Sequence, residues 1–264
     1  DFASVQRIAA QAGDIQVAGL ARCVPNDIDR CWEAVKVARH PRIHVFLSTS
    51  PLHMRYKLRK EPEDVLRMAV EGVKRCAVHT DNVEFSCEDF SRSEGDFVCR
   101  VVEAVINAGA TTINLPDTVG YAEPEEYAAL LDYVIKNTPN SDKAIFSVHC
   151  HNDLGLAVAN TLAAFKVGVR QAEVTLCGIG ERAGNASLEE VVMNLHVRPD
   201  PQDRHRADIS LLPAAFHDHR PAYPQQQGHC GGQRLCARIG HSPGRHAQKP
   251  RNLRDYDAAV RGTH

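Results

Sequence analysis

Residues 144–153 read Ala-Ile-Phe-Ser-Val-His-Cys-His-Asn-Asp, an apolar run that ends in two histidines. The run predicts a β-strand, in which alternate side chains point to the same face. His149 and His151 would therefore share one face, from which both imidazoles can reach one divalent metal, while Cys150 points the other way. The pair alone is also compatible with two core histidines, so the surrounding sequence has to decide between the two interpretations.

Short apolar runs alternate with amphipathic stretches from residue 1 to residue 198, a pattern typical of βα units around a parallel sheet. The predicted strands are 15–21, 43–48, 82–86, 112–115, 144–151 and 173–177. The predicted helices are 2–12, 27–38, 62–79, 96–108, 124–137, 155–167 and 187–195. Polar and glycine-containing motifs follow the strands at their carboxyl ends, where (β/α)8 barrels place their active sites.

These features predict the α/β class and an incomplete TIM (β/α)8 barrel of about six βα units. A doubly wound open sheet is the alternative, but functional-looking residues after each strand favour the barrel. Six strands do not close an eight-stranded barrel, and the last strand would then expose an unpaired edge.

Composition excludes several classes of function. The 264 residues carry a formal net charge of −2, which gives no reason to expect nucleic acid or an anionic membrane as a partner. No apolar run approaches the eighteen or so residues of a membrane span, and no signal peptide opens the sequence. The nine cysteines form no CxxC pair, so we expect reduced thiols in a cytoplasmic enzyme. Because the chain begins with Asp1 and not Met, we also expect it to be a piece of a longer protein.

The sequence from His149 to Val192 begins HCHNDLGLAVAN and includes GIGERAGN at 178–185. This stretch closely resembles the signature of the 2-isopropylmalate synthase and homocitrate synthase family. The segments 44–50 (HVFLSTS), 83–89 (VEFSCED) and 111–121 (TTINLPDTVGY) are similar to the same family. The resemblance runs from Asp1 to about Arg198, and relatives add, before it, a strand that supplies a metal-binding Asp and a catalytic Arg.

The resemblance implies an acyltransferase that condenses acetyl-CoA with 2-oxoisovalerate to give 2-isopropylmalate in leucine biosynthesis. A divalent metal, Mn²⁺, Mg²⁺ or Zn²⁺, would polarise the ketone of the 2-oxo acid, and a positioned base would take the methyl proton of acetyl-CoA. The intact family enzymes are expected to be homodimers. Because the upstream ligand and Arg are not in this sequence, we expect the 264-residue chain by itself to be inactive.

The metal ligands that the resemblance implies are His149, His151 and Asn185. On composition alone, Asn185 would be the N-cap of the helix that follows it, and both roles are compatible. Asn152 and Asp153 are expected to fix the orientation of the imidazoles, as outer ligands commonly do in metal sites.

The substrate-side residues come from three other strands. Glu88 is expected in the acid–base network, and Ser86 in contact with substrate or the acetyl group, although a lone Ser-x-Glu is usually a loop or cap. His44, at the start of its strand, is expected to contact the 2-oxo acid; a barrel-interior histidine is the alternative. Thr118 is expected to hydrogen-bond the substrate carboxylate, with a turn threonine as the alternative.

The glycine-rich segment 178–184 does not follow the first strand of a dinucleotide fold, so a nicotinamide cofactor is not expected. Glu181 and Arg182 are instead expected to form a structural pair in that loop.

Residues 1–198 are predicted to form the partial catalytic barrel, and 199–264 a separate tail. Half of the fourteen histidines lie in the tail, and periodicity disappears there. The segment 234–247 can be back-translated into codons that, read one nucleotide later, encode a family-like motif. We therefore expect a frameshifted, disordered tail, whose His229, Cys230 and Cys236 form no metal site.

Other functions stay open on the sequence alone. A homocitrate or citramalate synthase would differ mainly in the 2-oxo acid pocket. A lyase of the same superfamily, cleaving 3-hydroxy-3-methylglutaryl-CoA or a 4-hydroxy-2-oxo acid, would share the His-x-His-Asn-Asp motif. A folded but non-catalytic product of a broken gene is the third alternative.

Overall fold

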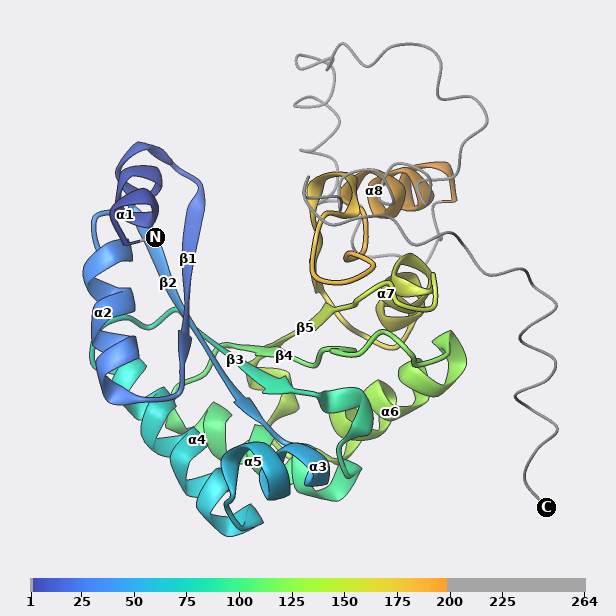
Figure 1. The fold of residues 1–264 in the computed structure, drawn as a ribbon, viewed down its shortest axis with the longest axis horizontal. Helices are drawn as coiled ribbons and strands as arrows, with labels where there is room; N and C mark the ends of the chain where they lie inside the picture. Colours follow the sequence, from blue (N-terminus) through green and yellow to red (C-terminus); the bar gives the residue numbers. More distant parts are fainter. Residues whose placement is uncertain (1, 199–264) are drawn as a thin grey trace, which may run out of the picture. The chain divides into compact units, whose positions relative to one another are not determined.

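The computed structural model describes residues 2–198, and the tail 199–264 lies outside the described residues, as do all predictions made for it. Six parallel strands form one sheet in the order in which they follow along the chain. They are β1 (Gln16–Arg22), β2 (His40–Ser48), β3 (Val83–Glu88), β4 (Thr112–Asn114), β5 (Ile145–His149) and β6 (Gln171–Glu173). The sheet curls into part of a (β/α)8 barrel with helices along its convex side, which confirms the predicted fold class (Figure 1).

The helices that connect the strands lie close to the predicted ranges. They are α1 (Phe2–Gln11), α2 (Pro25–Val35), α4 (Pro62–Ala77), α5 (Gly95–Ala108), α6 (Pro124–Asn137), α7 (Ala157–Lys166) and α8 (Leu188–Val197). Proline in the first turn of α2, α4 and α6 has the φ that a helix start requires, and its missing N–H costs nothing there. Among residues 2–198 no helix is long and apolar enough to cross a membrane.

The core lies between the sheet and these helices. Val65, Ala69 and Val73 of α4 are fully buried, and their spacing of four residues forms one helical stripe. The strands contribute the opposite wall with residues such as Ile43, Phe85 and other side chains on the helix-facing side. Cys150 is buried on this side, as predicted from the alternation around the two histidines.

The structure differs from the sequence predictions at three places. The last strand ends at Glu173, and Leu176–Gly178 forms a 3-10 turn in which Cys177 has a φ of 55°. After Glu173, the backbone makes a single β-bridge, between Thr175 and Ser187. The second correction concerns the segment after β2, where a short α3 (Pro51–His53) runs into a π-helix, η1 (Met54–Leu58), that the sequence pattern did not predict. His44 also lies in the middle of β2, four residues after its start, and not at its beginning.

The sheet has two open edges. Within residues 2–198, β1 pairs only with β2, and β6 pairs only with β5. Leu20, on β1, is 65% exposed, although it lies in a strand. Within residues 2–198, six of the eight strands of a closed barrel therefore form the sheet.

Candidate metal and substrate site

Polar side chains cover the concave side of the sheet, opposite the apolar core. In each strand they alternate with the core residues, so they share one face. They are Arg42, His44, Glu84, Ser86, Glu88, Asn114, Ser147, His149, Gln171 and Glu173. A protein interior filled with this many polar groups must satisfy them mutually or use them on a ligand.

His149 and His151 come together at the carboxyl end of β5. His149 is the last residue of β5, and His151 lies in a bridge to Asn185. Their Nε2 atoms are 3.2 Å apart and the two rings are edge to face. Two nitrogens bound to one metal at ~2.1 Å are separated by roughly 3.0–3.4 Å, so this pair has the spacing of two ligands on one ion.

Asn185 lies next to this pair through the backbone bridge to His151. Its Oδ1 is buried and has no hydrogen-bond partner among the described residues, while its Nδ2 donates weakly to the carbonyl of Ile179 at 3.4 Å. A Cβ on Gly180 would lie 2.6 Å from the Asn185 amide, so glycine is required there for the loop to pass the side chain. The N-cap of α8 is Ser187, which accepts from the Glu190 N–H, so the cap role considered for Asn185 was wrong.

These atoms fit a divalent cation. The Oδ1 of Asn185 is buried without a hydrogen-bond partner among the described residues, which is costly unless a ligand compensates. Two imidazoles and an amide oxygen are a donor set that suits Mn²⁺ or Zn²⁺ better than Ca²⁺. The three predicted ligands are therefore brought together at one end of the sheet, and their role as ligands stays a prediction.

Glu173 is the main site residue that the sequence did not reveal. It pairs in register with His149 on the neighbouring strand, and its Oε2 lies 3.2 Å from His149 Nδ1. Its Oε1 lies 3.6 Å from Nδ1 of His44. Burial opposes ionisation of Glu173, but hydrogen bonding to His149 and the positive charge available on His44 and His149 outweigh it and lower its pKa.

His44 and Ser86 form a direct pair on β2 and β3. Nε2 of His44 is 2.6 Å from Oγ of Ser86, which also accepts from Nδ2 of Asn114 at 2.8 Å. Burial lowers the pKa of His44, with the charge of Glu173 acting in the opposite direction. The two predicted substrate contacts are thus neighbours, and Asn114 joins them from β4.

Deeper in the sheet, Arg42 and Gln171 hold Glu84. The guanidinium of Arg42 donates to Glu84 at 2.9 Å and to Gln171 at 3.0 Å, and Gln171 donates to Glu84 at 2.8 Å. Burial, followed by the charge of Glu173, raises the pKa of Glu84 to about 7. The network links β2, β3 and β6, and its contact between Arg42 and Gln171 joins residues that are 129 positions apart in the sequence.

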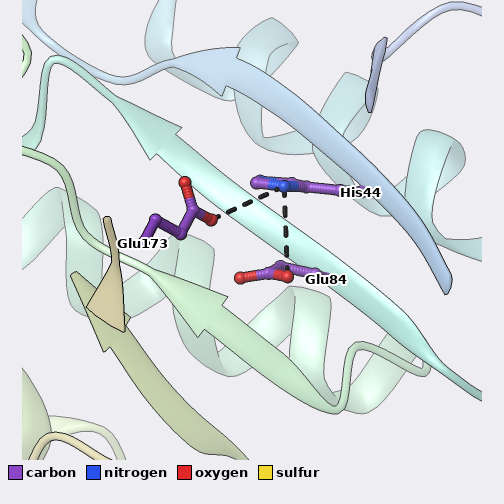
Figure 2. A group of neighbouring side chains, drawn as sticks. All are labelled: His44, Glu84 and Glu173. Atoms are coloured by element: carbon purple, nitrogen blue, oxygen red, sulfur yellow. Dashed lines mark ion pairs between the residues drawn. The ribbon is translucent and has the colours of Figure 1, made fainter. Parts of the chain in front are cut away.

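His44, Glu84 and Glu173 are a second group with metal-ligand chemistry, shown in Figure 2, and their nearest ligand atoms lie within 4.8 Å of one another. The guanidinium of Arg42 carries a permanent positive charge and donates a hydrogen bond to one carboxylate oxygen of Glu84. A cation there would be repelled by that guanidinium, so the geometry favours His149 and His151 as the ion-binding pair.

Glu88 lies at the carboxyl end of β3 in a different environment. Lys57, from the π-helix η1, donates to both carboxylate oxygens at 2.6 and 2.8 Å, and Ser48 also donates to Glu88. π-helical turns are frequent at functional sites, because the extra residue redirects a side chain. The ammonium group of Lys57 therefore lies beside Glu88, the predicted acid–base residue.

Thr118 lies at the end of the chain segment that follows β4. Its Oγ1 accepts from the backbone N–H of Asp89 at 2.9 Å, and its carbonyl accepts from Arg182 at 2.8 Å. Asp89 is fully buried and has a φ of 65°. Thr118 thus joins the loops after β3 and β4, which is a structural role compatible with the predicted contact to substrate.

The loop 178–185 contains the predicted pair of Arg182 with Glu181, at 3.5 Å. Arg182 also makes a closer bidentate pair with Asp153, at 2.7 and 2.9 Å. Asn152 accepts from the N–H of Ala157 at the start of α7. Asn152 and Asp153 therefore hold the loops, and the carboxylate beside an imidazole is that of Glu173.

The residues that sequence reasoning missed are Arg42, Lys57, Glu84, Asn114 and Glu173. All but Lys57 lie on a predicted strand or next to one, and alternation placed most of these on the same face as a predicted site residue. A polar residue at an inward strand position is therefore the signal that could have marked these residues as candidates.

The N-terminal part of the chain resembles known proteins. The model of the HMGL-like family matches residues 1–215. A 2-isopropylmalate synthase of Nitratidesulfovibrio vulgaris is 70% identical over 200 residues, which are 76% of this chain and 39% of that protein. The 2-isopropylmalate synthase of Methylococcus capsulatus is 58% identical over 200 residues, again 76% and 39%. The chain thus spans about two fifths of the length of these curated relatives.

A solved structure shares the fold at much lower identity. The HMG-CoA lyase from Acinetobacter baumannii, in complex with coenzyme A and 3-methylmalate, has a TM-score of 0.59 and 22% identity. The match covers 89% of this chain and 76% of that one.

Proposed function

The chain belongs to the HMGL-like family, and we propose that it is the larger part of the catalytic barrel of a 2-isopropylmalate synthase. The reaction would transfer the acetyl group of acetyl-CoA to 2-oxoisovalerate with formation of a carbon–carbon bond, in leucine biosynthesis. The observation that carries the proposal is the 3.2 Å pair of Nε2 atoms at the carboxyl end of β5, beside Asn185.

His149, His151 and Asn185 would hold the divalent metal. When bound, the metal supplies a Lewis acid that polarises the carbonyl of the 2-oxo acid. The protein contributes a rigid strand end for the two histidines and a glycine-bounded loop for Asn185.

The remaining residues would hold the substrates and move the proton. His44 and Ser86 lie as a hydrogen-bonded pair on the same face as the histidines and would contact the 2-oxo acid and acetyl group. Thr118 would hydrogen-bond the substrate carboxylate. Glu88 would take part in acid–base chemistry, with Lys57 orienting its carboxylate from 2.6 Å.

We propose the complete reaction for a barrel in which further strands pair with the outer edges of β1 and β6. Residues 1–198 would form the catalytic unit and 199–264 a separate region. Within residues 2–198 the outer edges of β1 and β6 have no neighbouring strand, so the polar face is not enclosed as it is in a closed eight-stranded barrel. The proposal therefore predicts binding by the 264-residue chain and no measurable turnover.

Binding of 2-oxoisovalerate tests this function. The ligand is titrated into the 15N-labelled 264-residue chain with and without Mg²⁺, and amide shifts are followed. We expect shifts near residues 149–151 and 185 that require Mg²⁺ and disappear in His149→Ala. The exposed His40→Ala variant, on the amino end of β2, is the matched control and should bind like wild type.

Two results would contradict the proposal. Metal-independent binding that survives His149→Ala would place the 2-oxo acid elsewhere. Preferential binding of 3-hydroxy-3-methylglutaryl-CoA over acetyl-CoA with 2-oxoisovalerate would favour a lyase over a synthase.

A further inference from the structure

Glu173 touches both halves of the candidate site. Its Oε2 is 3.2 Å from His149 Nδ1 and its Oε1 is 3.6 Å from His44 Nδ1. His149 belongs to the proposed metal ligands, and His44 to the proposed substrate contacts. Figure 2 shows Glu173 extending from its strand toward His44, and the ion pairs to Glu173 and Glu84 both start from Nδ1 of that imidazole.

The arrangement defines which nitrogen of His149 carries the proton. A carboxylate attracts an N–H and repels a nitrogen lone pair, so Glu173, which lies 3.2 Å from Nδ1 without hydrogen-bond geometry, favours the tautomer with the proton on Nδ1. Nε2 then keeps its lone pair, and that is the atom facing His151 Nε2 at 3.2 Å. A neutral imidazole binds a metal through the nitrogen that carries no proton.

We propose that Glu173 is the positioning residue of the site: it fixes the Nδ1–H tautomer of His149 and couples that ligand to His44. The inference rests on the proposed metal site and adds the residue that orients it. Through Glu173, the polar groups form one continuous chain from His151 and His149 to His44, and from there to Ser86.

The neighbouring carboxylate of Glu84 does not have this role. Its Oε2 lies 3.9 Å from His44 Nδ1, and its oxygens are occupied by Arg42 and Gln171. In the register of the sheet it lies on β3, whereas His149 lies on β5. Glu84 thus shares the cluster and the burial of Glu173 without pairing with His149, which makes it the matched control.

The test uses the 264-residue chain labelled with 15N at histidine, with Glu173→Gln and Glu84→Gln. Long-range 1H–15N spectra of the metal-free proteins report the tautomer of each imidazole. We expect the Nδ1–H form of His149 in wild type and in E84Q, and a mixture of tautomers in E173Q. Assignment comes from the signals lost in His149→Ala and His44→Ala.

A second readout is the affinity for Mn²⁺, measured by calorimetry. Loss of an orienting carboxylate beside a ligating histidine typically weakens metal binding 10–100-fold, and we expect that loss for E173Q and wild-type affinity for E84Q. Glu173→Asp keeps the acceptor and should retain the Nδ1–H form, which separates the role of the carboxylate from a general loss of folding.

The outcomes distinguish this inference from the function it builds on. If wild type binds Mn²⁺ and E173Q binds it equally, with an unchanged His149 tautomer, the inference is wrong and the metal site stands. If wild type binds no Mn²⁺, the proposed site fails, and the nitrogen signals still decide whether Glu173 fixes the imidazole.

Discussion

At the scale of single residues, the predicted histidines, Ser86 and Asn185 could be proposed from the sequence because their motifs are local. Alternation marks Glu173 and Glu84 as inward-facing, but it does not identify their partners, which lie 24 to 129 residues away in the sequence. Arg42, for example, meets Gln171 only when β2 and β6 take their places in the curled sheet. Alternation predicts the face of a side chain but not its partner.

Glu84 leads to a prediction about pH. Its pKa is raised from 4.5 to about 7 by burial and by the charge of Glu173, so the folded protein holds a proton that the unfolded chain releases. Below about pH 4.5 the carboxyl is protonated in both the folded and the unfolded chain, so it does not lower the free energy of unfolding. Between about pH 4.5 and 7 the unfolded chain ionises more readily than the folded one, so the free energy of unfolding falls as the pH rises. The cost above pH 7 is on the order of 3 kcal/mol.

The E84Q variant removes this titration. We expect the free energy of unfolding of wild type to fall relative to E84Q between about pH 4.5 and 7, and the difference to be constant above that. Urea titrations at a series of pH values measure it. A difference that does not change with pH across this window would show that Glu84 ionises normally in the folded protein.

At the scale of elements, the alternation of six strands and seven helices could be predicted from periodicity, because most of them bury one face. The π-helix η1 could not, since five residues are too few to show a period; its Lys57 contacts Glu88. The last strand was predicted too late in the sequence because 173–177 alternates like a strand. The chain instead turns at Leu176 to bring Asn185 to His151.

Packing of α4 against the end of β1 supplies an element-scale prediction. A Cβ on Gly72 would lie 2.0 Å from Sγ of Cys23, which is buried and contacts the Met68 carbonyl. Gly72→Ala gains helix propensity but overpacks this contact, and we expect a net loss of about 1–2 kcal/mol in the free energy of unfolding. The double variant with Cys23→Ala should recover stability relative to the sum of the single changes, and strict additivity would contradict the packing argument.

At the scale of the whole molecule, the sequence predicted a barrel with too few strands, and residues 2–198 form a six-stranded sheet with two open edges. Open edges predict uneven stability, because local opening is easiest where a strand has one neighbour. We expect amide hydrogens of β1 and β6 to exchange faster than those of β3 and β4, measured by mass spectrometry on peptides. Equal protection of β1 and β3 would mean that another strand covers the edge in solution.

His149 and His151 are proposed to share one metal ion. Pulsed electron paramagnetic resonance of the chain with Mn²⁺ counts the imidazole nitrogens bound to the ion. We expect nitrogen coupling from two imidazoles in wild type, from one in either His149→Ala or His151→Ala, and no change in His44→Ala. Coupling that is lost only in His44→Ala would place the ion with Glu84 and Glu173 and contradict a site at His149 and His151.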